Sequence, residues 1–311
     1  MLSICIPVYN FDVRALVDDL HEQALRCGVS FEIIVMDDAS DSSYLPYLQQ
    51  AAALPYVRLI TLNENIGRAK IRNAMVKEAR YPYVIFMDCD SATVSNDYIA
   101  QYLPLCQPNT VVYGGRRYKS EKPSDATLLH WKYGVERESL PASKRQKHPN
   151  FSFCTNNFLI DKAIFDVITF SEQLEGYGHE DTFFGLELLG HHILIQHIDN
   201  PLIHLGLETA EIFLKKTENG ITNLHKVELM LRKKYPDYVG HSKLMRSKIF
   251  LQKWHLLSLT NYLFKAFKPL LKRNLLGRRP SLFVFDLYKL GTLCLTSLSP
   301  VSQSKRYISI F

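Results

Sequence analysis

The feature of this sequence that most limits its fold is the regular alternation of apolar runs and helical patterns in its first half. Four apolar runs occur there, at residues 2–8, 31–36, 57–62 and 84–87. Helical patterns separate the runs, which start about 25–30 residues apart, as in βαβ units. The sequence therefore predicts an α/β fold, Rossmann-like, with a mostly parallel central sheet flanked by helices.

Each of these four predicted strands is followed by polar residues. The strand ends read Tyr9-Asn10, Asp37-Asp38, Asn63-Glu64-Asn65 and Asp88-Cys89-Asp90. Ligands of open α/β sheets bind beyond the carboxyl ends of the strands. We therefore expect these residues to line a binding site.

Asp88 and Asp90 are the most unusual of these residues. Carboxylates are seldom buried without a partner, and residues i and i+2 of an extended chain point the same way. Both acids are therefore expected to face one spot, where a divalent cation is the natural partner. The alternative is a polar turn that holds two aspartates by chance.

A second dense stretch, Gly176-Tyr-Gly-His-Glu-Asp181, precedes a helical pattern. Its glycines predict a flexible turn, so Glu180 and Asp181 are expected at a helix N-terminus. One of the two could be an ordinary helix cap, which stabilises a helix by about 1 kcal/mol. His204 ends another predicted strand, as a structural residue or as a ligand. Residues 115–150 form a long basic connection with little periodicity, of a length that is usually functional.

The charge of the chain is strongly asymmetric. Residues 1–205 carry 18 Lys and Arg against 25 Asp and Glu, a net charge of −7, whereas residues 206–311 carry 19 against 6, a net charge of +13. We therefore predict two domains, an α/β domain at 1–205 and a basic, mainly helical region at 206–311. Basic tails bind phosphate, in nucleic acid or on an anionic membrane. Nucleic acid is disfavoured, because the aromatic residues lie on leucine-rich helices rather than on a stacking platform.

The basic region contains predicted helices at 208–234 and 242–273 and an apolar segment at 281–301. Asp286 and Lys289 interrupt that segment, and each charge inside a membrane span costs roughly 2.5–3.5 kcal/mol. An amphipathic surface segment is therefore favoured over a membrane crossing. Peripheral contact of residues 242–301 with an anionic membrane and packing of these helices on the body remain as alternatives.

The six cysteines are scattered and form no Cys-x-x-Cys pair. This argues for reduced thiols in a cytoplasm and against a zinc site or a disulfide framework. Because residues 2–8 already read as a strand, no signal peptide is expected. The predicted location is therefore cytoplasmic.

Five motifs occur in order and at ordinary spacing: Ser3-Ile-Cys-Ile-Pro-Val-Tyr-Asn10, Val35-Met-Asp-Asp-Ala-Ser40, Asn65-Ile-Gly-Arg-Ala-Lys-Ile-Arg-Asn73, Phe86-Met-Asp-Cys-Asp-Ser91 and Gly178-His-Glu-Asp181. Together they resemble the family 2 glycosyltransferases, which have a GT-A nucleotide-sugar-binding fold. The resemblance covers about residues 1–205, and the basic tail resembles bacterial members that work at the inner face of the cytoplasmic membrane. It implies an inverting hexosyl- or N-acetylhexosaminyltransferase with a nucleotide-sugar donor, UDP-linked by preference. The implied acceptor is a glycan or a lipid-linked glycan in bacterial surface polysaccharide or glycolipid synthesis.

The resemblance also implies roles for the matching residues. Tyr9 resembles the ring that packs on the base of the donor, and Asp38 resembles the acceptor of the imino proton of that base. Asp181 resembles the catalytic base that takes the proton of the acceptor hydroxyl, and Glu180 would hold its neighbour in place or share the role. The other expected donor-binding residues are Pro7, Asn10, Arg68, Arg72 and Asp88.

Asp88 and Asp90 resemble the metal-binding DXD motif of the family, which implies Mn²⁺ or Mg²⁺ as the cofactor. Asp90 would bind the ion, and Asp88 would contact the ribose or a metal-bound water. His204 resembles the distal histidine that completes the metal site in some GT-A enzymes. The ion would neutralise the charge that develops on the diphosphate leaving group. A single in-line attack assisted by one base would invert the anomeric centre.

Three other functions share parts of this pattern. Phosphatases of the haloacid dehalogenase type also place Asp-x-Asp after an apolar strand, but they carry Thr or Val two residues later, where this chain has Ala92. Their motif also opens the chain. A nucleotidyltransferase would show a glycine-rich loop after the first strand, and residues 9–12 contain no glycine. An inactive glycosyltransferase-like subunit that only assembles with a partner would have lost the acids, which are all present.

Overall fold

The computed structural model describes residues 1–174, 176–240 and 242–297, which form two compact units. The first unit consists of Met1–Lys122, Tyr133–Gly176 and Glu180–Leu207. The second consists of Pro123–Lys132, Tyr177–His179 and the described residues from Glu208 onward. The division into domains at 1–205 and 206–311 stays a prediction about independent folding.

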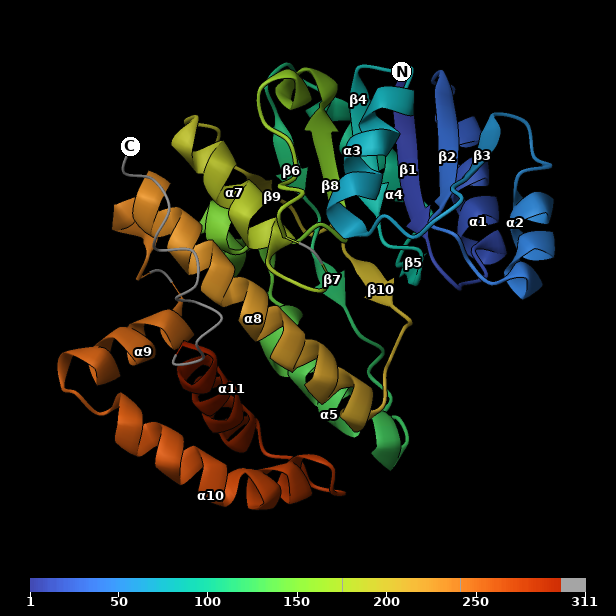
Figure 1. Cartoon of the computed structure of the whole chain (residues 1–311). Coiled ribbons are helices and arrows are strands. Elements are labelled where there is room, and N and C mark those ends of the chain that lie inside the picture. The colour runs from blue at the N-terminus through green and yellow to red at the C-terminus, as the bar shows by residue number, and fades with distance from the viewer. Residues whose placement is uncertain (175, 241, 298–311) are drawn as a thin grey trace. The chain divides into compact units, whose positions relative to one another are not determined.

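Seven strands of the first unit's described residues form one mixed sheet (Figure 1). In spatial order they are β3 (Val57–Thr61), β2 (Phe31–Asp37), β1 (Leu2–Val8), β4 (Tyr83–Met87), β8 (Asn157–Asp161), β6 (Val111–Tyr113) and β9 (Gln196–His197). The strands β3, β2, β1 and β4 are parallel to their neighbours, as are β6 and β9. β8 lies between β4 and β6 and is antiparallel to both. The predicted mostly parallel sheet is thereby confirmed.

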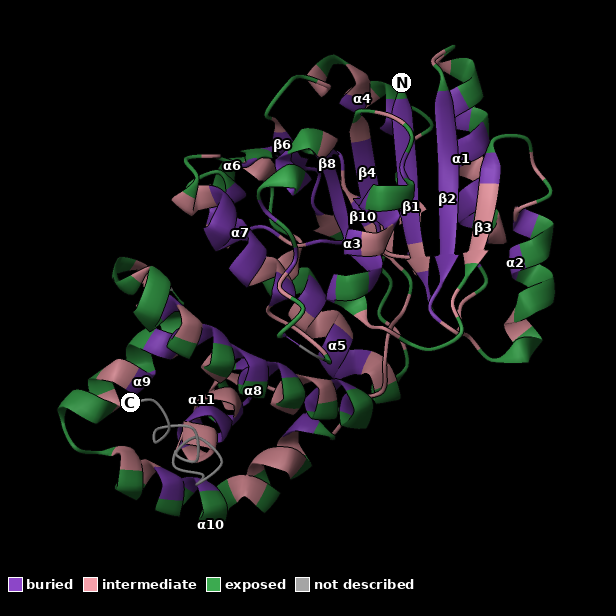
Figure 2. Ribbon diagram, turned by 45° about the horizontal axis from the view of Figure 1, so that its top comes forward, coloured by how far each residue is buried: buried purple, intermediate pink, exposed green. Residues whose placement is uncertain are grey.

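From β1 to β4 the helices of the first unit alternate with the strands as predicted. The helices of this unit are α1 (Arg14–Arg26), α2 (Leu45–Ala51), α3 (Arg68–Glu78), α4 (Tyr98–Tyr102), α6 (Ala142–Arg145) and α7 (Glu180–Gly190). α6 lies in the stretch 115–150, where no helix was predicted. β1 and β2 are buried along nearly their whole length (Figure 2), as expected of strands that are covered on both faces. α3 begins directly after Gly67, whose φ of 82° is a conformation that glycine adopts without strain.

A second sheet of three short strands also lies in the first unit. Its strands are β5 (Ser91–Thr93), β10 (Leu202–His204) and β7 (Arg116–Arg117), with β10 in the middle. β10 runs antiparallel to β5 and parallel to β7. The sequence indicated only the strand end at His204, because strands of two or three residues hold too few positions to show a period.

The second unit is helical. It contains most of α5 (Leu128–Tyr133), together with α8 (Ala210–Lys234), α9 (Lys243–Lys253), α10 (Leu257–Leu275) and α11 (Leu282–Ser297). α8 agrees with the helix predicted at 208–234. The single helix predicted at 242–273 is wrong, because the chain breaks into α9 and α10 around His255, whose φ is 55°. Phe213 of α8 stacks on Phe285 of α11, with ring centroids 5.5 Å apart.

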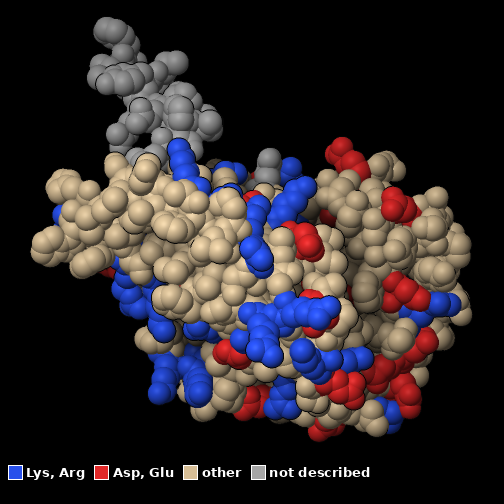
Figure 3. Space-filling model, turned by 90° about the horizontal axis from the view of Figure 1, so that it is seen from below, with Lys and Arg blue, Asp and Glu red and all other residues tan. Residues whose placement is uncertain are grey.

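The apolar segment predicted at 281–301 forms α11 as far as Ser297, and residues 298–301 lie outside the described part of the chain. No helix among the described residues is long and apolar enough to cross a membrane. Figure 3 shows Lys and Arg side chains gathered next to a broad uncharged surface.

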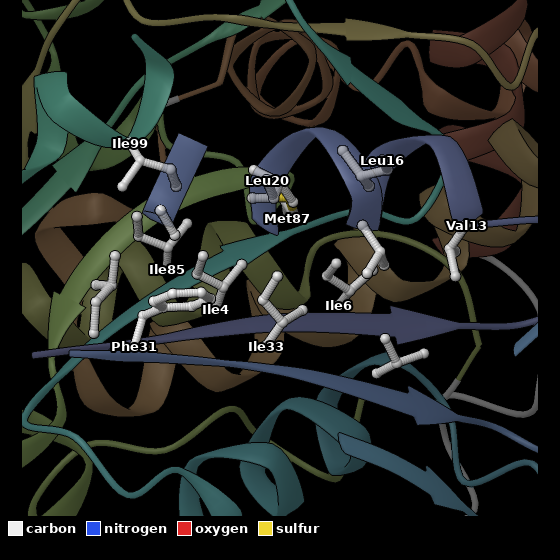
Figure 4. Packing of buried hydrophobic residues seen from close by; sticks show 14 of the residues in the cluster. Ile4, Ile6, Val13, Leu16, Leu20, Phe31, Ile33, Ile85, Met87 and Ile99 are labelled. Carbon is white, nitrogen blue, oxygen red and sulfur yellow. The ribbon is translucent and has the colours of Figure 1, made fainter. Parts of the chain in front are cut away.

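Two apolar clusters fill the two faces of the central sheet. Ile4 and Ile6 of β1 belong to one cluster and Cys5 to the other, because successive side chains of a strand point to opposite faces. Leu16 and Leu20 of α1 pack in the first cluster (Figure 4), and residues of α3 and α7 pack in the second. This core holds the carboxyl ends of β1, β2 and β4 in fixed positions.

Candidate active site

The short three-stranded sheet brings Asp90 and His204 together. β5 and β10 pair so that Ser91 lies opposite His204, and the backbone N–H of Leu205 donates to the backbone oxygen of Asp90 at 2.8 Å. As a result, Nδ1 of His204 lies 3.4 Å from Oδ1 of Asp90. These two residues are 114 positions apart in the sequence (204 − 90).

Asp90 is ionised at neutral pH. Burial alone would raise the pKa of this carboxyl, but the hydrogen bond with His204 and the charges of Arg116 and Arg68 outweigh burial and lower the pKa to about 2. Gly206 leaves room for the carboxylate, since a Cβ atom at that position would lie 2.2 Å from Oδ2 of Asp90. The local backbone therefore accepts only glycine beside this acid without a shift.

Asp88 is held by two arginines. Arg72 of α3 donates from Nη2 to Oδ1 of Asp88 at 2.8 Å, and Arg116 of β7 donates from Nη2 to Oδ2 at 3.2 Å. The Arg72 residue is only 2% exposed, and its Nη1 donates to the backbone oxygen of Arg68. Each oxygen of Asp88 thus accepts a charge-assisted hydrogen bond, and the orientation of the carboxylate is fixed.

Sequence reasoning included Arg72 among the site residues but missed Arg116. Arg116 lies in the segment 115–150, where the sequence shows little periodicity. The one available signal was the pair Gly114-Gly115 directly after a predicted strand and directly before two arginines. A glycine pair at such a place often forms a tight turn, which sets the direction of the residues that follow.

Glu180 and Asp181 begin α7, as predicted. The Asp181 carboxylate accepts from the backbone N–H of Thr182 at 2.6 Å. Burial removes the Asp181 carboxyl from water, and the neighbouring Glu180 carboxylate repels a second negative charge. Together they raise the pKa of Asp181 to about 7. An acid with this pKa can accept a proton near neutral pH.

Arg68 interacts electrostatically with both acidic groups of the site, Asp90 and the pair Glu180–Asp181. Its Nη1 lies 3.7 Å from Oε1 of the buried Glu180. The charge of Arg68 also acts to lower the pKa of both Asp90 and Asp181. The structure thus gathers Arg68, Arg72, Asp88, Asp90 and His204 with the start of α7 in one region of the first unit.

The tips of β1 and β2 form a second part of the site. Pro7 is half-buried near the end of β1, and the Tyr9 side chain that follows is 53% exposed. Asn10, with a φ of 51°, receives a hydrogen bond from the backbone N–H of Asp41 at 2.7 Å. The backbone of Tyr9 also hydrogen-bonds to the thiol of Cys89, which connects this tip to the Asp88–Asp90 segment.

Asp38 supports the loop in front of α3. Its Oδ1 accepts from the backbone N–H of Ile66 at 2.7 Å, and its Oδ2 accepts from that of Gly67 at 3.1 Å. Burial raises the pKa of Asp38, although these two hydrogen bonds act in the opposite direction. Both oxygens are therefore already engaged, and the contact of Asp38 with a nucleotide base stays a prediction.

The donor set suits a divalent metal that is shared with a ligand. No group of three or more His, Cys, Asp and Glu side chains able to hold a metal occurs in the part of the chain that the structure describes. Mg²⁺ is commonly bound by one or two carboxylates together with substrate phosphates and water. The ionised Asp90 carboxylate beside the His204 imidazole, in the space left by Gly206, fits such an ion.

Comparison with known proteins gives a consistent result. A model of the family described as "Glycosyl transferase family 2" matches residues 3–169. The chain is 24% identical over 247 residues to the uncharacterized glycosyltransferase YfnE of Bacillus subtilis, covering 71% of this chain and 61% of that protein. It is 29% identical over 160 residues to chondroitin synthase of Pasteurella multocida, covering 49% of this chain and 16% of that protein. The matches thus span less than two thirds of the length of these curated relatives.

A solved structure supports the fold. The mannosyltransferase PcManGT from Pyrobaculum calidifontis, in complex with GDP-Man and Mn²⁺, superposes with a TM-score of 0.61 at 14% sequence identity. The match covers 98% of this chain and 88% of that chain. At this identity the likeness shows a shared GT-A fold and nothing finer.

Proposed function

The chain belongs to glycosyl transferase family 2, and from that premise we propose that it transfers a sugar from a nucleotide-sugar donor to a hydroxyl group of a glycan or lipid-linked acceptor. The observation that carries the proposal is the arrangement of Asp90, His204 and Arg68 near the start of α7. The proposal is supported by the nearness of the proposed metal ligands Asp90 and His204, the guanidinium of Arg68 and the Asp181 carboxyl, whose pKa is raised to about 7. The similarity to chondroitin synthase favours polysaccharide synthesis as the setting.

The donor is proposed to bind at the tips of β1, β2 and β4. The exposed ring of Tyr9 is available to stack on the base, and Pro7 and Asn10 shape that end of the site. We propose that Arg68, whose side chain is 44% exposed, binds phosphate oxygens and that Arg72 acts through its hydrogen bond to Asp88. We propose a UDP-sugar as the donor and a hexosyl or N-acetylhexosaminyl group as the sugar, and GDP-sugars are the second class to test, because PcManGT was solved with GDP-Man.

Mn²⁺ or Mg²⁺ is proposed to bind at Asp90 and His204. When bound, such an ion supplies charge neutralisation for the diphosphate leaving group. Asp88 is proposed to contact the ribose or a metal-bound water rather than the ion itself, because Arg72 and Arg116 already neutralise the charge of its carboxylate. The protein contributes the orientation of these groups.

Asp181 is proposed as the catalytic base. Its ionised form would take the proton of the acceptor hydroxyl as that oxygen attacks the anomeric carbon, and Glu180 would keep the pKa of Asp181 high by its negative charge. One attack on the face opposite the leaving diphosphate inverts the anomeric centre. The expected product carries the sugar in the opposite anomeric configuration to the donor.

The test is donor hydrolysis and transfer with a panel of nucleotide sugars and MnCl₂. We expect release of UDP or GDP from a subset of donors, and loss of that release in Asp181→Asn once an acceptor is identified. Asp166→Asn, an exposed aspartate of the same unit, is the matched control and should behave as the wild type. Inorganic phosphate released from phosphomonoesters would instead favour a phosphatase. Donor binding without any release would favour an inactive subunit that assembles with a partner.

We also propose peripheral contact of residues 242–301 with an anionic membrane, at the inner face of the cytoplasmic membrane. The outward surface of α9 and α10 carries large apolar side chains that are each more than 40% exposed: Phe250, Trp254, Leu259, Tyr262, Leu263, Phe267 and Leu270. Phe264 and Leu275 of α10 point inward and are buried. Lys265 and Lys272 of α10 supply positive charge, and such a pattern is typical of helices that lie in a membrane interface.

Vesicle sedimentation tests this contact. The full chain should sediment with vesicles that contain phosphatidylserine and much less with pure phosphatidylcholine vesicles. The double variant Leu263→Ser/Phe267→Ser should lose sedimentation, whereas Val167→Ser, which changes a 70% exposed valine of the first unit, should not. Equal sedimentation of both variants would contradict the proposed surface.

A further inference from the structure

Arg116 connects two acidic side chains of the first unit. Its Nη2 donates to Asp88 at 3.2 Å, and its Nη1 donates to Oε2 of Glu138 at 3.4 Å. Burial alone would lower the pKa of Arg116, but Glu138, Tyr118 and Asp88 raise it well above its usual value. Without this cation, two partly buried carboxylates would each lose an ionic partner.

The backbone in front of Arg116 is held firmly in place. Gly115 has a φ of 99°, and a Cβ atom there would lie 2.7 Å from Nη2 of Arg145. The buried Arg145 guanidinium donates to four backbone oxygens, those of Tyr113, Gly114, Leu140 and Ile198. Asn157 donates to the backbone oxygen of Gly115 at 2.9 Å. These contacts fix the direction in which β7 leaves the turn.

Tyr118, two residues after Arg116, lies against His204. The parallel strands β7 and β10 pair with Arg116 opposite Leu202, so the same register brings Tyr118 beside His204. The two rings meet edge to face with centroids 5.2 Å apart. Arg116 of β7 contacts Asp88, and Tyr118, the residue directly after β7, contacts His204. These alternate residues share one side of an extended chain.

Glu138 closes this set of contacts. Its carboxylate accepts from the Tyr118 hydroxyl and from Arg116. Gly134 makes room for the tyrosine, because a Cβ atom there would lie 2.2 Å from Cζ of the Tyr118 ring. Arg116, Glu138 and Tyr118 therefore form a connected group that touches Asp88 at one end and His204 at the other.

We propose that Arg116 is a positioning residue, which holds Asp88 directly and His204 through Glu138 and Tyr118. Groups that orient metal-binding side chains usually contribute 10–100-fold, in order of magnitude, to metal affinity or activity. The inference rests on the proposed function in one respect only, which is that the bound ligand is a metal ion with a nucleotide. The contacts themselves are properties of this chain.

Metal and nucleotide binding without turnover gives the first test. The affinity for Mn²⁺ alone and for UDP or GDP with MnCl₂ is measured by calorimetry on the full chain. We expect Arg116→Met to weaken binding about 10–100-fold and Arg116→Lys to restore part of it. Arg117→Met changes the exposed neighbour on the same strand and should bind as the wild type. Equal binding by Arg116→Met and the wild type would overturn the proposal.

Tyr118→Phe gives the second test, because it removes only the hydroxyl and keeps the ring against His204. We expect weaker Mn²⁺ binding with little change in the midpoint of thermal unfolding, whereas a merely structural role would shift the midpoint and leave Mn²⁺ binding unchanged. Crystal structures of Tyr118→Phe and Arg116→Lys should show His204 and Asp88, respectively, displaced or in more than one orientation. Both side chains in place would overturn the proposal, whichever nucleotide is the donor. Nucleotide binding without donor cleavage in the wild type would contradict the proposed function but not this inference.

Discussion

Replacing Gly206 by alanine should disturb the proposed metal site while leaving the fold intact. The added Cβ atom would lie 2.2 Å from Oδ2, 3.0 Å from Cγ and 3.2 Å from Cβ of Asp90. Ordinary contacts of carbon begin at about 3.5 Å, so the methyl group and the carboxylate must separate by about 1 Å. The carboxylate is the end of a short side chain, and its rotation away from His204 is the easiest way to relieve the overlap.

The size of the effect follows from that displacement. Overpacking a site costs about 1–3 kcal/mol of stability, which a unit with two well-filled apolar clusters tolerates. A displacement of about 1 Å in a catalytic site can cost about 100-fold in rate. We therefore expect Gly206→Ala to lower kcat about 100-fold and to raise the Mn²⁺ concentration that gives half-maximal rate at least about tenfold.

The assay is donor turnover against MnCl₂ concentration, with thermal unfolding measured in parallel. Gly220→Ala is the matched control, because a Cβ atom there would lie 3.7 Å from its nearest neighbour, the backbone oxygen of Tyr177. In the interior of a helix this change should stabilise by about 0.5–1 kcal/mol and leave turnover unchanged. Gly206→Ala with the wild-type rate and metal requirement would refute the assignment of Asp90 to the metal.

Three further predictions concern other groups. The protonated form of Asp181 cannot accept a proton, so kcat/KM should rise about tenfold per pH unit up to about pH 7 and then level off. Asp181→Asn should lower kcat about 10²–10⁴-fold and lose this pH dependence. A flat pH profile of the wild type would contradict the role of Asp181 as the base. Arg72→Met should destabilise the protein by about 1–3 kcal/mol in urea unfolding, because Oδ1 of Asp88 loses its donor while Arg116 still pairs with the carboxylate. A loss below about 0.5 kcal/mol would argue against this role of Arg72. In the second unit, burial would raise the pKa of Glu228, but hydrogen bonds from three basic side chains, the buried Lys248 among them, lower it from 4.5 to about 2. The stability that the ionised Glu228 contributes is present above about pH 4.5 and is lost as the pH falls towards 2. Acid unfolding followed by circular dichroism should therefore depend less on pH in Glu228→Gln than in the wild type. An unchanged unfolding curve would contradict this stabilising role of Glu228.

The main sheet could be predicted because its signals are local. β1 and β4 are continuous apolar runs that end in polar residues, and each can be recognised from a few neighbouring positions. The helix over 242–273 was predicted as one piece, since its apolar period passes through residue 255. Only the backbone conformation of His255 reveals the break, and no side-chain period reports it.

The candidate site was predictable only in part, because its scaffold is made by long-range pairing. Asp88, Asp90, Glu180 and Asp181 stand at element ends that the sequence marks. Residues such as Arg116 and Glu138 lie in a stretch with little period, and β7 is two residues long. Its position depends on pairing with β10, which is about 85 residues later in the chain.

The two aspartates of the Asp-Cys-Asp motif differ in their partners, and this difference bears on their roles. Asp88 accepts from two guanidinium groups, so a cation that bound its carboxylate would have to displace one of two charge-assisted hydrogen bonds. Asp90 has an imidazole at 3.4 Å and packs closely against Gly206, and no arginine among the described residues lies within hydrogen-bonding distance of its carboxylate, so a cation would not have to displace one. Of these two identical side chains, Asp88 is thus held in place by arginines, and Asp90 is the one we propose as a metal ligand. The partners that distinguish them come from α3, β7 and β10, so the fold gives a reason of its own for the proposed assignment of Asp90 to the ion, beside the resemblance of the motif.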